Sequence, residues 1–203
     1  MARRNDHSRD ELREMALTAA EGLLDQQGSE ALSTRKIAGA IGYSAGSLYQ
    51  IFKNYDDLCW QLNQRTLAKL LDALDHTESA KHNPQQALQL YATQYLAFAE
   101  QWPQRWALLF EHRTPLDLDA PDELEQAIST LFGKVEQPLR ELFNERAEAE
   151  IVQAARTLWA GVHGITVLKA HNKLFQAEQD CAEQMAHTLL DRYVQGWLQE
   201  ETR

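Results

Sequence analysis

The chain has 203 residues, of which 44 % are hydrophobic and 25 % charged, with a formal net charge of −10. This balance excludes wholesale disorder, and the length suits one compact domain or two small ones. The best candidate for a membrane span, the uncharged residues 157–168, is too short to cross a bilayer, and the N-terminus turns acidic where a signal peptide would turn apolar. Two cysteines, Cys59 and Cys181, cannot form a disulfide framework, so we expect a cytoplasmic protein with reduced thiols.

Apolar residues recur at helical spacing along the whole chain, and few glycines or prolines interrupt them. We therefore predict an all-α fold of about nine helices. The first helix begins with a capping pair, Ser8 and Glu11, and ends at Gly28. The predicted helices cover residues 8–28, 33–41, 44–52, 54–75, 85–101, 103–110, 122–144 with an interruption near Pro138, 148–171 and 179–200.

The short second and third predicted helices lie in the one basic part of an acidic chain. Residues 33–55 contain Arg35, Lys36 and Lys53 and no acidic residue. Two short helices joined across a glycine and packed under a longer helix describe a helix-turn-helix unit. The third helix begins with residues 44–47, which are small or polar, as entry into a DNA major groove about 12 Å wide requires. From spacing alone, an ordinary helical corner fits equally well.

Three segments of this unit, LSTRKIA (32–38), IGYS (41–44) and GSLYQIFKN (46–54), resemble the DNA-binding signature of tetracycline-repressor-type regulators. Residues 159–164, WAGVHG, resemble the Trp…His-Gly pattern of one C-terminal subgroup of that family. The resemblance implies a homodimer with a DNA-binding domain at 1–57 and a ligand-binding and dimerisation domain at 58–203. It implies these DNA-binding residues: Thr34, Arg35, Lys36, Ser44, Ala45, Gly46, Ser47, Tyr49, Gln50, Lys53 and Tyr55. At Tyr55 the family usually has a lysine, so this chain lacks a charge there. An N-terminal arm of Arg3, Arg4 and Arg9 could enter a minor groove or remain a solvated end.

Aromatic residues in the C-terminal part form a stripe that either lines a ligand pocket or is plain core. The candidate ligand-binding residues are Tyr91, Tyr95, Phe98, Trp102, Trp106, Phe110, Trp159 and His163, of which we expect only two or three of the stripe to touch a ligand. His163 is alternatively a satisfied core histidine. Gly161 and Gly164 either allow a close helix approach or make room for the Trp159 ring. The last two helices are candidates for a four-helix dimer interface through Val162, Ile165, Leu189, Tyr193 and Trp197.

No nucleophile, phosphate-loop, dinucleotide or metal-ligand pattern is recognisable, so we expect neither an enzyme nor a cofactor or metal. The interpretation is a regulator, most often a repressor in this family, that binds double-stranded DNA as a homodimer and is released by a small-molecule effector. The alternative is an all-α small-molecule-binding or protein-interaction protein whose first three helices no longer bind DNA. The net charge and Tyr55 motivate that alternative.

Overall fold

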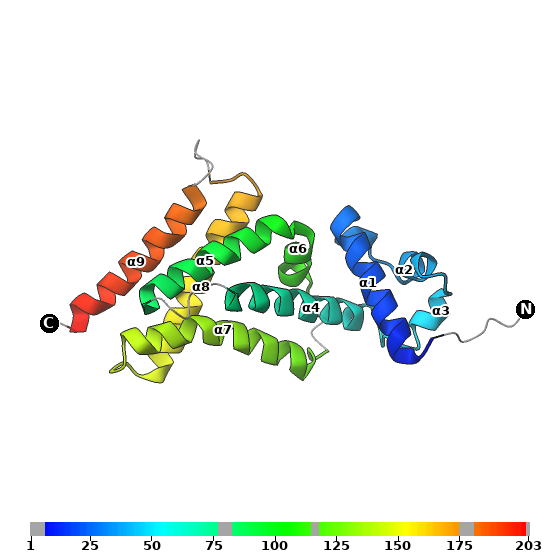
Figure 1. The fold of residues 1–203 in the computed structure, drawn as a ribbon, viewed down its shortest axis with the longest axis horizontal. Coiled ribbons are helices and arrows are strands. Elements are labelled where there is room, and N and C mark those ends of the chain that lie inside the picture. Colours follow the sequence, from blue (N-terminus) through cyan, green and yellow to red (C-terminus); the bar gives the residue numbers. More distant parts are fainter. Residues whose placement is uncertain (1–6, 77–82, 115–117, 175–180, 202–203) are drawn as a thin grey trace, which may run out of the picture. The chain divides into compact units, whose positions relative to one another are not determined.

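The computed structural model describes residues 7–76, 83–114, 118–174 and 181–201. Within these ranges the chain forms nine α-helices and one 3₁₀ turn and no strand, which confirms the predicted all-α fold. The elements in order are α1 Arg9–Gln27, η1 Ser29–Ala31, α2 Thr34–Ala40, α3 Ala45–Leu48, α4 Tyr55–Asp75, α5 Pro84–Gln101, α6 Pro103–Glu111, α7 Asp122–Leu142, α8 Glu148–Ala170 and α9 Cys181–Glu201 (Figure 1).

The chain divides into two compact units, and each unit consists of two segments that are separate in sequence. The first unit contains Met1–Leu67 and Trp102–Glu125, and the second contains Ala68–Gln101 and Gln126–Arg203. The division falls inside α4, and α6 belongs to the first unit. The boundary expected between residues 57 and 58 concerned function rather than packing, and it stays a prediction.

Local side-chain caps explain why the first three helices begin where they do. The Ser8 hydroxyl accepts a hydrogen bond from the Glu11 amide at 3.2 Å, and the Glu11 carboxylate accepts one from the Ser8 amide at 2.6 Å. This is the predicted capping box, and the bond from the Ser8 backbone lowers the pKa of Glu11. Ser33 and Ser44 cap α2 and α3 in the same way, each accepting from the amide three residues further on.

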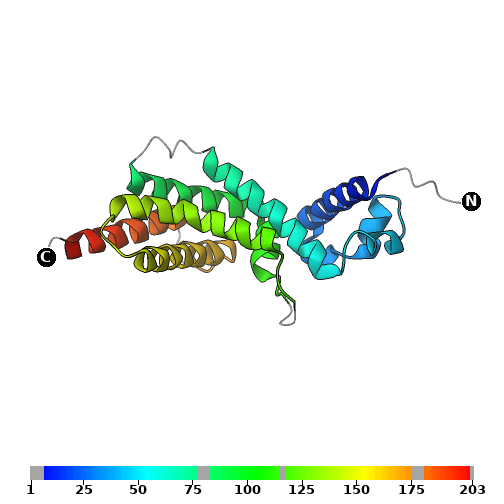
Figure 2. The ribbon, with the colours of Figure 1, turned by 90° about the horizontal axis from the view of Figure 1, so that it is seen from below.

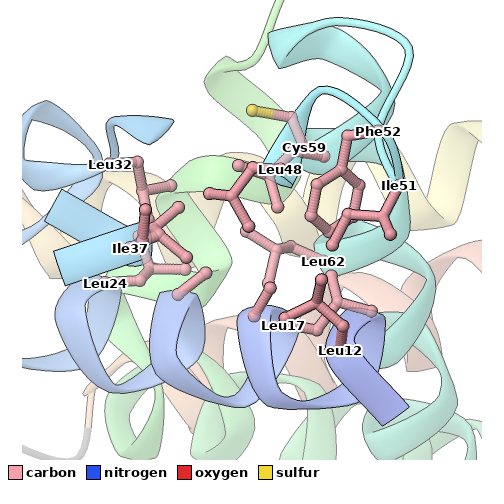
Figure 3. Packing of buried hydrophobic residues seen from close by; sticks show 14 of the residues in the cluster. Leu12, Leu17, Leu24, Leu32, Ile37, Leu48, Ile51, Phe52, Cys59 and Leu62 are labelled. Carbon is pink, nitrogen blue, oxygen red and sulfur yellow. The ribbon is translucent and has the colours of Figure 1, made fainter. Parts of the chain in front are cut away.

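The core of the first unit joins α1 to the two short helices and to the start of α4. In Figure 3, Leu12, Leu17 and Leu24 extend from α1 toward the labelled side chains of the other segments. The other buried members include Ile37, Leu48, Ile51, Phe52, Leu62 and, from α6, Leu108. Each fully buried side chain of this kind contributes roughly 1.5–3 kcal/mol, so this core holds α2 and α3 firmly against α1.

In the second unit α9 packs along both α5 and α8 (Figures 1 and 2). A Cβ atom built on Gly161 of α8 lies 2.3 Å from Cδ2 of Leu189 of α9, so the predicted close helix approach at Gly161 is confirmed. The predicted interruption near Pro138 is wrong, because α7 continues through that residue to Leu142. Proline removes one backbone donor and can be accommodated in a helix whose other hydrogen bonds and packing remain.

Candidate nucleic-acid interface and ligand cavity

The turn between α2 and α3 sets the direction of the third helix. Gly42 has φ +74°, a left-handed conformation that favours glycine. The next residue, Tyr43, donates its amide proton to the Ala38 carbonyl at 2.9 Å. The turn therefore closes directly on the end of α2, and the two helices form the compact helix-turn-helix that the sequence predicts.

The third helix buries one side and presents the other to solvent. Leu48 is fully buried in the core of the first unit, whereas Ser44, Gly46 and Gln50 are exposed. Ser44 and Ser47 are hydrogen-bonded to each other at 3.0 Å between their hydroxyl oxygens. The regular helix ends at Leu48, and the next residues continue as a tight turn with Phe52 N bonded to the Leu48 carbonyl at 2.9 Å. The outward surface of α3 is thus free of bulk at its N-terminal end, as entry into a major groove would require.

Polar and basic side chains flank this surface on both sides. Tyr49 is 64 % exposed, and its hydroxyl lies 3.4 Å from Oγ1 of Thr34 on α2. Arg35, Lys36 and Lys53 are exposed as well. The structure thus brings the hydroxyls of Thr34 and Tyr49 together. Two groups that bind the same phosphate must lie this close to each other.

A hollow beside the third helix contains residues that the sequence analysis did not assign. Arg9 and Arg13 of α1 and Gln61 of α4 line it together with Tyr49, Gln50 and Lys53. It contains three cationic side chains and one carboxylate, that of Asp57. The sequence suggests Arg9 only as part of an N-terminal arm, and Arg3 and Arg4 of that arm lie outside the described residues.

Arg13 connects α1 to the end of the third helix. Its Nη2 donates to the Ile51 carbonyl at 3.4 Å and its Nη1 to Asp10 at 3.2 Å, while its buried Nε has no hydrogen-bond partner within the described ranges. Ile51 is 38 residues away in sequence, so no local pattern could have indicated this contact. A cation at the edge of the apolar face of the first helix was the one available signal.

Tyr55 does not line the hollow beside the third helix. It lines a different hollow of the first unit, together with Ser29 and with Glu111 and Arg113 at the end of α6. Burial raises the pKa of Tyr55, with a further contribution from the neighbouring Cys59. Burial also raises the pKa of Cys59, to about 11, so this thiol is protonated and unreactive at neutral pH. A phosphate contact by Tyr55 stays a prediction.

The second unit encloses a cavity of about 50 Å³ between five helices. Its walls come from α4, α5, α7, α8 and α9, and Lys134 of α7 is the charged residue among them. The aliphatic side chains that line it are Leu74, Leu88, Leu131, Val135, Leu158 and Leu190, with Val162. Such an apolar cavity with few polar groups is typical of small-molecule sites.

A hydrogen-bonded chain of three side chains borders this cavity. Trp159 Nε1 donates to the Tyr95 hydroxyl at 3.1 Å, and that hydroxyl lies 3.0 Å from Nδ1 of His163. Burial raises the pKa of Tyr95 and lowers the pKa of His163. Both side chains are therefore neutral at pH 7, and the histidine tautomer sets which of the two donates the hydrogen bond between them.

Only part of the predicted aromatic stripe lines the cavity. Tyr91, Tyr95 and Trp159 are among its walls, whereas Phe98 is buried elsewhere in the same unit. His163 is hydrogen-bonded to Tyr95 without lining the cavity. The rest of the predicted set belongs to the first unit: Trp102, Trp106 and Phe110.

The predicted dimer residues fall on different surfaces of the second unit. Ile165 and Leu189 line a shallow surface groove between α8 and α9. Val162 points into the cavity and is buried within the single chain. Tyr193 and Trp197 are half-buried, with the Trp197 ring 4.9 Å from that of Phe143 in a T-shaped contact.

Comparison with known proteins gives the family. The model described as "Tetracyclin repressor-like, C-terminal domain" matches residues 88–193, and the one described as "Bacterial regulatory proteins, tetR family" matches residues 16–59. The chain is 27 % identical to the nucleoid occlusion factor SlmA of Photobacterium profundum over 139 residues, which are 66 % of this chain and 67 % of that protein.

Two solved structures are similar over nearly the whole chain. A transcriptional regulator from Rhodococcus sp. RHA1 has a TM-score of 0.67 at 20 % identity, with 91 % of this chain and 96 % of that chain covered. FadR from Bacillus subtilis in complex with stearoyl-CoA has a TM-score of 0.68 at 14 % identity, with 90 % and 98 % covered. At these identities the likeness concerns the fold.

The helix-turn-helix and the all-helical second unit define a DNA-binding transcriptional regulator and not an enzyme. The chain belongs to the tetracycline-repressor family of bacterial regulatory proteins. Membership of the subgroup with the Trp…His-Gly pattern stays a prediction, because the matching descriptions name no subgroup.

Within the described residues, no helix is both long and apolar enough to cross a membrane. The same residues contain no cluster of three or more His, Cys, Asp or Glu side chains suited to a metal ion.

Proposed function

We propose that this protein is a homodimeric, ligand-responsive repressor that binds a palindromic operator and is released by a small molecule. The exposed surface of α3, flanked by Thr34, Tyr49 and Lys53, is the observation that carries the proposal. Two such surfaces in a dimer read half-sites about one helical turn apart. In this proposal Gln50 contacts a base edge, Lys53 contacts a phosphate, and Arg35 contacts a base edge or a phosphate.

The ligand part of the proposal has two supports. The second unit contains an apolar cavity, and FadR, a similar structure, was solved with stearoyl-CoA bound. Helix α4 supplies residues to both compact units, so a ligand that displaces its C-terminal part acts on a helix shared with the first unit. A coupling of about 1–3 kcal/mol between ligand and DNA is typical of such regulators.

The dimer part of the proposal is supported by the groove between α8 and α9, where small and apolar side chains are open to solvent. Ile165 of α8 lines the groove and is half-buried, whereas Ile128 of α7 is exposed and lies outside the groove. Ile165→Glu is expected to convert a dimer to a monomer in sedimentation experiments, while the matched Ile128→Glu leaves the mass unchanged. A wild-type chain that sediments as a monomer at micromolar concentration contradicts the dimer.

The experiment for DNA binding is the selection of bound fragments from a genomic DNA pool at two salt concentrations. A recovered palindrome that is lost at higher salt supports the proposal, because phosphate contacts release counterions. Gln50→Ala is expected to relax base preference at one or two positions, by about 1–3 kcal/mol. Lys53→Ala is expected to weaken all sequences alike and to lower the salt slope by about one unit.

Lys173→Ala is the matched control for charge, since Lys173 is exposed and lies outside the helix-turn-helix. Recovery of no sequence at low salt, even after refolding free of ligand, refutes the proposal and favours a protein partner. Unaltered binding by both Gln50→Ala and Lys53→Ala refutes the assignment of this surface.

A further inference from the structure

The cavity of the second unit discriminates among ligand shapes. Its volume of about 50 Å³ is far below the roughly 300–1,000 Å³ of a pocket for a drug-sized molecule. Aliphatic side chains make most of the wall, and Phe132 and Val135 of α7 are only half-buried. The cavity must widen for any such ligand, and an unbranched alkyl chain requires less displacement of the wall than a broad ring system does.

The polar groups at the wall do not favour a polar ligand. The indole N–H of Trp159 already donates to the hydroxyl of Tyr95, and that hydroxyl is also hydrogen-bonded to His163. A ligand that hydrogen-bonds to these groups must first break those bonds, and a ligand polar group left unpaired in the cavity is costly. The inner part of the ligand is therefore hydrocarbon.

One charged side chain lies in the cavity wall. Lys134 of α7 lines the cavity and is ion-paired with Asp75 at the end of α4. The Asp75 side chain is 56 % exposed, so it returns to water at little cost when another anion takes its place. Residues 122–136 of α7 hold four carboxylates and this one cation, a distribution that suits one negative charge and repels a polyphosphate.

We propose that the cavity binds an unbranched aliphatic monocarboxylic acid, with its chain among the leucines and its carboxylate on Lys134 in place of Asp75. Binding then exchanges an ion pair between α4 and α7 for one between ligand and α7. As an effector, this acid rests on the function proposed above, but its binding to the purified protein does not. The two inferences can therefore fail separately.

The test is calorimetric titration of the full chain with decanoate, 1-decanol and decanoyl-CoA. Decanoate is expected to bind about fivefold more tightly than decanol, as one partly exposed ion pair provides. Decanoyl-CoA is expected to bind more weakly than decanoate. Lys134→Met keeps the apolar stem and is expected to abolish the preference for the acid over the alcohol. Lys173→Met removes a charge outside the cavity and is expected to retain that preference.

Two further variants keep the result interpretable. Asp75→Asn removes the competing anion and is expected to tighten decanoate binding but not decanol binding. Ala92→Leu places added bulk on the cavity wall and is expected to weaken both ligands. Equal affinity of the wild type for acid and alcohol overturns the assignment of Lys134. Binding of neither ligand overturns the ligand class, even where the DNA selection recovers a palindrome. Decanoate binding without any recovered DNA overturns the proposed function alone.

Discussion

Arg105 is the buried cation that fastens α6 to α1 within the first unit. Its side chain is 6 % exposed, and its guanidinium donates to both oxygens of Asp25 at 2.8 and 2.7 Å and to Glu21 at 2.8 Å. These bonds, chiefly the one to Asp25, raise the pKa of Arg105. The guanidinium also lies 4.7 Å from the centre of the Trp102 ring. Replacing this side chain therefore removes several contacts at once.

The expected cost of Arg105→Met follows from what remains. Breaking a fully buried ion pair costs about 3–5 kcal/mol. In the variant the Asp25 carboxylate is still solvated, because its side chain is 31 % exposed, and Glu21 retains its ion pair with Arg65 at 3.4 Å. Neither carboxylate is therefore left as an uncompensated buried charge. We expect a loss of about 2–3 kcal/mol in the free energy of unfolding of the first unit. For a chain of this size that loss lowers Tm by roughly 5–10 °C.

The assay is thermal unfolding followed by circular dichroism, with Arg113→Met as the matched control. Arg113 follows the same helix but is exposed, so its replacement is expected to change Tm by no more than about 1–2 °C. A Tm for Arg105→Met within that range refutes a stabilising role for the network. An equal loss in Arg113→Met refutes the reasoning from burial.

Three smaller predictions concern the second unit. Tyr95→Phe removes the hydroxyl that both the Trp159 N–H and the His163 ring contact, so we expect a loss of about 1–3 kcal/mol in the free energy of unfolding measured with urea. An unchanged urea midpoint contradicts this hydrogen-bonded chain. Because burial lowers the pKa of His163 below its ordinary 6.5, its stabilising contribution is complete above that pH and is lost as pH falls through the lower folded-state value. His163→Asn is expected to flatten this dependence, and identical pH profiles would refute it. Gly133 has open space where a Cβ atom would lie, so Gly133→Ala is expected to raise the free energy of unfolding by about 1 kcal/mol. Gly161→Ala must displace Leu189 and is expected to raise it less. An equal increase for both variants would show that Leu189 moves freely.

The sequence predicts the helices well because their signals are local. The serine caps, Gly28, Gly42 and the apolar spacing each act within one or two turns. For the same reason the helix-turn-helix and its exposed third helix are predictable residue by residue. Pro138 shows the limit of this reasoning, since a breaker residue is overridden where a helix is packed on both sides of it.

The site is less predictable because its contacts join residues that are far apart in sequence. Arg13 reaches Ile51, and Tyr95 reaches Trp159 and His163, through packing that no periodicity encodes. Val162 shows the same limit, since a helix with apolar residues on several faces does not reveal which face a second chain covers. The cavity arises from five helices and has no signature in any one of them.

The composition of the first unit also limits how such regulators are recombined. The segment Trp102–Glu125, which contains α6, supplies Leu108 to the core in addition to Arg105. It also places His112 Nε2 at 3.0 Å from Asp56, and Thr114 Oγ1 accepts a hydrogen bond from the Trp60 indole at 3.3 Å. A chimera that exchanges only the residues before the division inside α4 between relatives separates each of these pairs. Domain shuffling, in the laboratory or in evolution, therefore succeeds only where α6 is exchanged together with the helices on which it packs, or where the contacting residues of both segments are substituted together.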